Sequence, residues 1–411
     1  MPIRYKILGA LWFYQIAFGM DRIAIAFAGP GILKSLSMGP QSLGVILSAF
    51  GFGYMFTQIP AGFIADRWRL KTLLFILPLL WSAFTGATAL ISTLAAFVVI
   101  RACLGVAEGM AVPGIFRAVA ESFSAKERTR AMAISSTASA IGPAIAGPII
   151  GLVMASYGWR CAFYVLAVPP LVAALLVALV LPTTIGRHDP IPFHAPDAEP
   201  AGSGGDLSRL MTHPALWVCV AVFFFFNVAY WGYQGWMPSY LASVRHIDLK
   251  HLGFVGGLPY VFAFVGLLTF GFLGTALDRW RSQLLAAAYA LAGVSLYLAY
   301  GSMSVSRAVA GLCCAAFCLS GGIPLFASLL YEIAPRKRSA SYAGIIFTAG
   351  QIGGFIAPFI IGALLQRTTS YASGFELMEG ALIAAAAGMC LLPIFIKPRR
   401  GPGETQLSLA I

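Results

Sequence analysis

Long apolar runs, separated by short polar segments, cover almost the whole chain. Twelve of these runs are long enough to cross the roughly 30 Å apolar core of a bilayer as helices. The sequence therefore predicts an all-α integral membrane protein with twelve transmembrane helices. The predicted spans are residues 7–29, 44–65, 72–92, 94–117, 131–154, 161–181, 214–242, 251–276, 282–303, 308–331, 339–364 and 374–396.

The apolar pattern is interrupted once, by a stretch rich in Pro, Gly and acidic residues between the sixth and seventh spans. Such a composition is typical of a flexible linker. We therefore predict four parts. They are an N-terminal six-helix bundle (1–181), a cytoplasmic linker (182–213), a C-terminal six-helix bundle (214–398) and a cytoplasmic tail (399–411).

The two halves of the chain repeat each other. The segment GFIADRWRLKTLL (62–74) matches GTALDRWRSQLLA (274–286), 212 residues further on. In transporters built from parallel six-helix repeats, the binding site lies near the membrane midplane between the halves. The repeat therefore predicts two pseudo-symmetric six-helix bundles with a site between them.

Composition and charge fit this architecture. The chain is 59% hydrophobic and 10% charged, whereas soluble domains carry about 25% charged residues. If the N-terminus is inside the cell, most of the 27 Lys and Arg fall on inner loops, which predicts that both termini are cytoplasmic and favours the bacterial inner membrane. The net charge of +12 then belongs to these loops and does not indicate nucleic-acid binding.

Two predicted spans carry charges away from their ends. Such charges cost several kcal/mol inside a bilayer and normally face a protein interior or a watery pathway. Asp21 and Arg22 lie on the first span, and Arg101 and Glu108 on the fourth. Seven residues make almost two turns, so Arg101 and Glu108 share a face. The second half repeats the fold without these charges, which argues against a purely structural role. The residues aligned with them are Tyr233, Gln234, Cys313 and Ser320.

A second group of charges occurs in both halves, at the ends of helices. Asp66 and Arg67, preceded by Gly62, are matched by Asp278 and Arg279. We expect these residues to shape the loops and to act as conformational gating residues rather than to bind substrate.

The motifs now support a resemblance. Residues 62–71 resemble the G-x-x-x-D-R-x-G-R-[RK] signature of the major facilitator superfamily, with Trp68 in place of the usual glycine. More narrowly, the chain resembles the anion:cation symporter family, which includes galactonate, hexuronate, phthalate and sialic-acid carriers. The matching segments are MDRIAIA (20–26), YMFTQIPAG (54–62), RACLGVAEGMAVPG (101–114), GWRCAFYV (158–165) and WMPSYL (236–241).

The resemblance implies the major facilitator fold and proton-coupled uptake of a small organic anion by alternating access. The anion would be a monocarboxylate, an aromatic acid or a sugar acid. By the same resemblance, Arg22 binds the substrate carboxylate and Tyr54 faces the substrate. Asp21 and Glu108 carry the proton, paired with Arg101. A guanidinium matches a carboxylate with a fork of donors.

Four further residues are candidates for substrate binding. Ser135 could line the cavity or serve in helix packing. Asn227 and Gln234 lie on the seventh span, where a buried amide needs a partner. Phe347 stands where sugar-acid carriers have an asparagine, which favours a compact or aromatic monocarboxylate over a polyhydroxylated acid.

Other classes of function fit the sequence less well. The spans contain no HExxH or GxSxG motif and no paired His/Cys ligands, so we expect no enzyme activity, no metal and no cofactor. A channel would not need protonatable groups beside an anion site. An organic-anion exchanger or efflux carrier of the same fold remains the alternative. The expected partners are a small organic anion, a proton and the lipid bilayer, and we expect a monomer.

Overall fold

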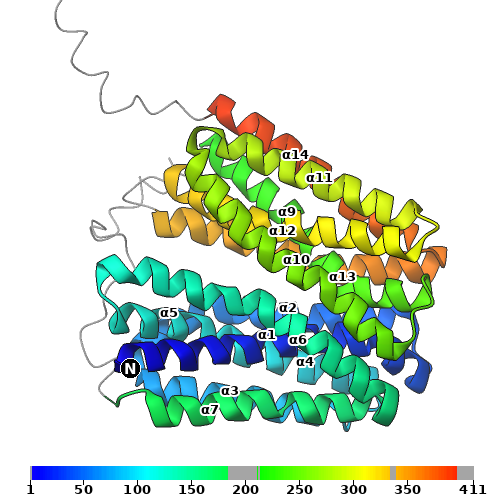
Figure 1. Cartoon of the computed structure of the whole chain (residues 1–411), viewed down its shortest axis with the longest axis horizontal. Coiled ribbons are helices and arrows are strands. Elements are labelled where there is room, and N and C mark those ends of the chain that lie inside the picture. Colours follow the sequence, from blue (N-terminus) through cyan, green and yellow to red (C-terminus); the bar gives the residue numbers. More distant parts are fainter. Residues whose placement is uncertain (1, 184–210, 212, 334–338, 396–411) are drawn as a thin grey trace, which may run out of the picture.

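The computed structural model describes residues 2–183, 211, 213–333 and 339–395, except for side chains at a few helical positions. These residues form long helices, joined by short turns and one 3₁₀ turn (Figure 1). The first half contains α1 (Ile3–Leu36), α2 (Pro40–Arg67), α3 (Leu70–Thr88), α4 (Leu94–Gly109), α5 (Ala111–Ser122), α6 (Ala125–Leu166) and α7 (Val168–Val180). The second half contains α9 (Pro214–Ser243), α10 (Leu249–Ala276), η1 (Asp278–Trp280), α11 (Arg281–Gly301), α12 (Val305–Ile333), α13 (Ser339–Thr368) and α14 (Ala372–Phe395).

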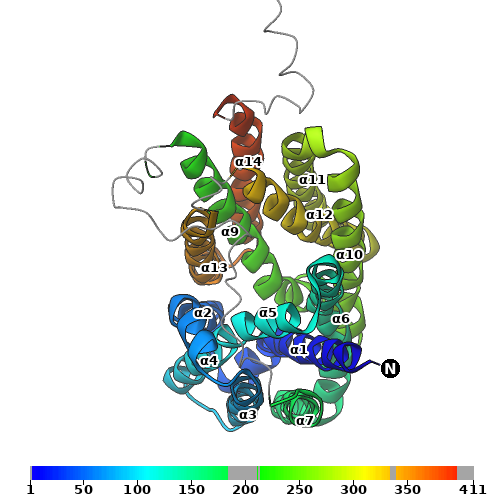
Figure 2. The same cartoon turned by 90° about the vertical axis from the view of Figure 1, so that its left-hand side faces the viewer.

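The helices form two bundles that lie side by side, α1–α7 in one and α9–α14 in the other (Figures 1 and 2). Among the described residues, ten stretches are long and apolar enough to cross a membrane. The sequence predicts twelve. The stretch from Arg130 to Val180 contains two of the predicted crossings, and α2 supplies another helix, of 28 residues, that is described only in part.

A glycine separates the two crossings within α6 and α7. Gly158 has φ 81° and ψ 169°, and here the chain turns back towards the end from which α6 began (Figure 1). Residues with a Cβ rarely adopt this conformation, whereas glycine does so at little cost. Gly158 therefore allows two antiparallel helices to follow each other without a longer loop.

A proline explains the break between α4 and α5. Pro113 has no backbone N–H, so it cannot donate to the carbonyl group four residues earlier, at Gly109. The helix is interrupted at Met110, close to this missing hydrogen bond. The fourth predicted span is thus built as two helices, and α4 holds both Arg101 and Glu108.

The two bundles touch through α2 against α13 and α6 against α10. These contacts depend on glycines that allow backbones to approach. A Cβ at Gly44 would lie 2.6 Å from the carbonyl oxygen of Pro358, and one at Gly147 would lie 2.7 Å from that of Gly253. All four positions lie in the halves of their helices that are farther from the N-terminus of the chain. The bundles are therefore packed together at that end of the molecule.

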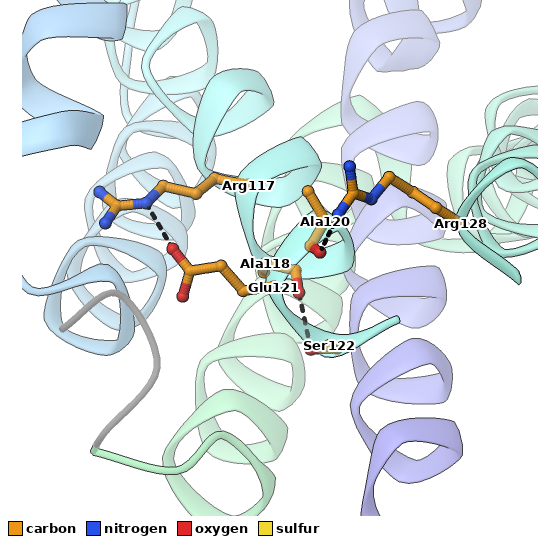
Figure 3. A network of polar contacts seen from close by, with 6 residues as sticks. All are labelled: Arg117, Ala118, Ala120, Glu121, Ser122 and Arg128. Carbon is orange, nitrogen blue, oxygen red and sulfur yellow. Dashed lines mark hydrogen bonds and ion pairs between the residues drawn. The ribbon is translucent and has the colours of Figure 1, made fainter. Parts of the chain in front are cut away.

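At the opposite end, a polar network fixes the turn between α5 and α6 (Figure 3). Arg117 Nε lies 2.7 Å from Glu121 Oε1, one turn further along α5. Arg128 Nη2 donates to the Ala120 carbonyl at 3.0 Å. The last carbonyls of a helix lack intrahelical partners and carry a partial negative charge, so a guanidinium stabilises the end of α5.

Candidate functional site

The four charged residues predicted inside the membrane come together in the N-terminal bundle. Arg22 Nε lies 3.3 Å from Glu108 Oε2, which joins α1 to α4. The Asp21 and Glu108 carboxyl groups face each other closely enough to share a hydrogen bond when one of them is protonated. Arg101 lies within electrostatic reach of both acids. Glu108 is 0%, Asp21 1% and Arg101 2% exposed, so their charges are balanced almost without water.

Asp21 has a further partner from a third helix. The Thr85 hydroxyl on α3 donates a hydrogen bond of 2.7 Å to Asp21 Oδ1. The second oxygen, Asp21 Oδ2, has no hydrogen-bond donor among the described residues. The same holds for Glu108 Oε1. The acid pair therefore keeps one free acceptor on each carboxyl group.

Small residues bring α4 close enough to place these charges. A Cβ at Gly105 would collide with the backbone of Phe50, and one at Gly53 with that of Ala102. Glycine at such positions allows membrane helices to pack closely. The glycine-rich sequence around Glu108 thus positions its side chain beside α1 and α2.

Arg22 lies in a cage of aromatic rings. Its guanidinium carbon is 4.1 Å from the ring centre of Phe18 and 4.6 Å from that of Tyr54. The Phe50 and Trp231 ring centres are 5.5 and 5.6 Å away. Rings at these distances stabilise a cation through their electron-rich faces. Nη2 of Arg22 is buried and has no acceptor in the part of the chain that the structure describes, while the Arg22 side chain as a whole is 21% exposed.

The cage forms one wall of a cavity between the two bundles. Its empty space is about 930 Å³, including the part open to solvent. The lining residues come from both bundles and are mostly apolar. They are Phe18, Gly19, Arg22, Ile23, Ala26, Leu47, Phe50, Gly51, Tyr54, Arg101, Ser139, Pro143, Tyr230, Trp231, Gln234, Gly235, Gln351, Gly354 and Pro358.

The second bundle contributes amide groups to the cavity. Gln234 Nε2 donates to the Tyr230 hydroxyl at 3.1 Å, while Gln234 Oε1 is buried without a donor among the described residues. Gln351, on α13, also lines the cavity. Sequence reasoning missed Gln351, although an amide inside a predicted span was the signal that identified Gln234. It also missed Phe18 and Phe50, which no sequence signal distinguishes from other aromatic residues.

Three predicted substrate-binding residues do not line the cavity. Ser135 accepts a hydrogen bond from Gln15. Asn227 donates to the Phe223 carbonyl of its own helix at 2.8 Å. Phe347 is 42% exposed, and its ring packs edge-on against Phe223 with centres 5.3 Å apart. The argument from Phe347 against a hydroxylated substrate therefore has no support in this geometry.

The predicted gating residues whose side chains the structure describes lie away from the cavity. Asp278 and Arg279 form the exposed turn η1, in which the Arg279 backbone N–H donates to Asp278 Oδ1 at 2.7 Å. The side-chain positions of Gly62, Asp66 and Arg67 lie outside the described residues. Their gating role stays a prediction.

Known transporters resemble this chain in sequence, and a solved transporter structure resembles it in fold. The chain is 29% identical to a probable sulfoacetate transporter of Cupriavidus necator, over 96% of this chain and 94% of that protein. It is 23% identical to a hexuronate transporter of Bacillus subtilis, over 95% of both. The fold matches a bacterial homolog of the human lysosomal transporter Spinster, in an inward-facing and occupied conformation. That match has a TM-score of 0.79 and 17% identity, and it covers 96% of this chain and 98% of the other.

A family model matches residues 11–358, most of the chain. Its description agrees with the two helical bundles, the cavity between them and the relatives named as transporters. The chain belongs to the Major Facilitator Superfamily, whose members are membrane transporters and not enzymes.

Proposed function

We propose that this protein is a secondary active transporter that takes up a small organic anion together with protons by alternating access. Several relatives are named for organic acids: sulfoacetate, hexuronate and L-galactonate. The cavity offers a matching anion site, because the Arg22 side chain lines it and is 21% exposed. A carboxylate or sulfonate would bind there through the guanidinium.

One observation carries the coupling. Arg22 lies on the cavity wall and at the same time contacts the buried Glu108. An anion bound to Arg22 takes over part of the charge that neutralises Glu108. A buried carboxylate that loses its counterion is costly, and binding a proton removes that cost. Anion and proton would therefore load together, through a single side chain.

The acid pair provides the proton site. Asp21 and Glu108 face each other, and one proton shared between two carboxyl groups reduces the repulsion of like charges. Arg101 would balance the charge of the pair when the proton leaves. Asp21, Glu108 and Arg101 thus form the proton-coupling group, and Arg22 and Tyr54 bind substrate.

The conformation fits the proposed orientation. With both termini in the cytoplasm of a bacterial cell, the glycine contacts that join the bundles lie on the outer side. The state described here would then open towards the cytoplasm. The proposed organisation keeps an N-terminal bundle (1–181), a linker (182–213), a C-terminal bundle (214–398) and a tail (399–411), and it needs only one copy of the chain.

The alternative is exchange or efflux of an organic anion. A quinolone resistance transporter of Acinetobacter baumannii is 24% identical over 92% of this chain, and the same fold serves both directions. Proton dependence of net uptake separates the two possibilities.

The test uses purified protein in liposomes with an inward proton gradient. Sulfoacetate, galactonate, glucuronate and benzoate would be offered as substrates. We expect one or more of them to accumulate, and a protonophore to abolish accumulation. Accumulation that survives the protonophore and follows a sodium gradient would refute proton coupling, and accumulation of none of the acids would refute the substrate class.

A further inference from the structure

A second group of residues packs around the acid pair, on the side away from the cavity. Tyr14 lies seven residues before Asp21 on α1, and Trp81 lies four residues before Thr85 on α3, so each shares a face with its partner. The Tyr14 and Trp81 rings meet edge-to-face with centres 5.0 Å apart. Because Thr85 contacts Asp21, these two faces pack together and bring Tyr14 and Trp81 next to the acids.

The polar atoms in this region complement each other but are unpaired. The Tyr14 hydroxyl and Trp81 Nε1 are buried donors without an acceptor among the described residues. Asp21 Oδ2 and Glu108 Oε1 are buried acceptors without a donor there. The Tyr14 hydroxyl also lies within electrostatic reach of the Glu108 carboxylate. Buried polar groups are rarely left unpaired in native proteins, and a small polar space is usually filled by water.

We propose that Tyr14, Trp81 and Thr85 form a donor wall, that is, a set of hydrogen-bond donors behind the acid pair. This inference rests on the proposed proton coupling. Thr85 donates directly, and Tyr14 and Trp81 donate through one bound water that the two free carboxyl oxygens also contact. The three residues are positioning residues: they stabilise the deprotonated pair and so help to set the pH at which it releases its proton. They take no part in substrate binding.

The chemistry of the wall favours water over a metal cation. A cation needs acceptors around it, and it would leave the O–H of Tyr14 and the N–H of Trp81 unpaired. A water can accept from one donor while it donates to a carboxylate oxygen. Around the space the chain is apolar, because Leu11, Leu77 and Leu104 belong to the same buried cluster as Tyr14 and Trp81. The water would therefore be a fixed part of the site and not a step of a path.

The repeat in the sequence supports a role linked to the acids. At the offset of 212 residues, the second half has Phe226, Gly293 and Tyr297 in place of the three wall residues. The Tyr14 hydroxyl and the Trp81 indole thus have no counterpart in the second half, whereas the third position keeps a hydroxyl in Tyr297. Packing alone would not require this difference.

Other charged and titratable groups also act on the pair and must stay constant in a test. Arg22 and Arg101 contact or face it directly, and two tyrosines of the cavity act through Arg22. The groups that face the pair are Arg22 and Tyr14 from α1, Tyr54 from α2, Arg101 from α4 and Tyr230 from α9. The variants below therefore change only Tyr14, Trp81 and Thr85.

The first experiment measures the pH profile of active uptake and of substrate exchange in liposomes. Tyr14→Phe, Trp81→Phe and Thr85→Val remove one donor each. Without that donor the pair keeps its proton to higher pH, so the alkaline limb of the uptake profile should move up by roughly one pH unit, the scale of one hydrogen bond to a charged group. Exchange of preloaded substrate, measured on the acidic side of the profile, should change less than twofold. Thr85→Ser should restore the native profile.

Tyr289→Phe is the matched control. Tyr289 on α11 is also 0% exposed with an unpartnered hydroxyl, but it stacks on Phe226 in the other bundle. It should leave the profile unchanged. Unchanged profiles in Tyr14→Phe and Trp81→Phe, or an equal shift in Tyr289→Phe, would overturn the proposal.

A second measurement does not depend on transport. The ultraviolet resonance Raman band that reports hydrogen bonding of the indole N–H, taken as wild type minus Trp81→Phe, isolates Trp81 from the other tryptophans. We expect a hydrogen-bonded N–H, because the proposed water accepts from Trp81, and a weaker bond in Tyr14→Phe, where that water loses one of its partners. A free N–H in the wild type at every pH would overturn the wall. A hydrogen-bonded N–H in a protein whose uptake ignores protons would instead overturn the proposed function and leave the water site standing.

Discussion

The Nε atom of Arg22 lies 3.3 Å from Glu108 Oε2, and the same guanidinium lines the cavity between the bundles. One side chain therefore connects the solvent-accessible space with an acid that is completely buried. Its Nη2 atom is buried and has no acceptor among the described residues. In the proposed mechanism, anion binding and the charge state of Glu108 are linked through this one residue, without any movement of distant elements.

Replacing Arg22 with lysine should weaken substrate binding by roughly ten- to a hundredfold, the scale of a lost hydrogen bond to a charged group. Lysine keeps the positive charge but loses the planar fork that a carboxylate or sulfonate matches. Binding of the transported acid to the purified variant, measured by calorimetry, checks this.

Arg160→Lys serves as the control for Arg22→Lys. Arg160 also lies against an aromatic ring, that of Trp159 at 4.3 Å, but it does not line the cavity. It should bind substrate like the wild type. Equal affinities in all three proteins would remove Arg22 from the anion site.

Neutral substitutes for the acids should separate accumulation from exchange. Asp21→Asn and Glu108→Gln resemble the protonated forms, so neither variant can cycle a proton. We expect active accumulation to be lost in both, while exchange of preloaded substrate survives in at least one. Paired assays of proton-driven uptake and counterflow in liposomes make the comparison. Equal loss of binding, accumulation and exchange in both variants would mean that the acids are structural or bind substrate directly.

The charged part of the site could be predicted because charges are rare and costly inside a membrane span. Asp21, Arg22, Arg101 and Glu108 needed only this argument and the uncharged second half of the repeat. The wall residues Tyr14 and Trp81 could not be found in this way. Their importance lies in which polar atoms are left unpaired, and this is visible only once α1 and α3 are packed together.

Three of the uncharged candidates lie one turn before the cavity lining along their helices. Ser135, Asn227 and Phe347 each lie four residues before a residue that lines the cavity, and those residues are Ser139, Trp231 and Gln351. The two sets share a helical face, but one turn is about 5.4 Å. Periodicity fixes the face of a helix and not the depth of the cavity, which depends on how the two bundles meet.

Gln234→Leu should discriminate between classes of anion. Gln234 Oε1 is a buried acceptor at the cavity wall, so it suits a substrate that carries a hydroxyl donor. Affinity for galactonate or glucuronate should fall about five- to tenfold, the scale of one hydrogen bond, while affinity for benzoate should not fall. Competition binding with these three acids measures the difference.

Phe347→Asn tests the depth of the cavity in the same assay. The ring lies outside the lining and packs on Phe223, so the added amide should leave the order of the three acids unchanged. A gain in affinity for the hydroxylated acids would show that the substrate reaches one turn further along α13 than the cavity does.

The contact between α6 and α10 predicts how the resting conformation can be shifted. A Cβ at Gly253 would collide with the Gly147 carbonyl, and the atoms in its way belong to the backbone and cannot rotate aside. Gly253→Val should therefore disfavour the state in which the bundles meet at this end and should favour the opposite one. Spin labels on the two bundles, at the loops after α1 and before α10, would show a longer distance in electron paramagnetic resonance. Gly271→Val, on the same helix but with no atom within 4 Å of its added Cβ, makes the same change in helix propensity and should keep the native distance. If both variants lengthened the distance equally, a general effect of valine on α10 would explain the change, and the glycine contact would not hold the bundles together.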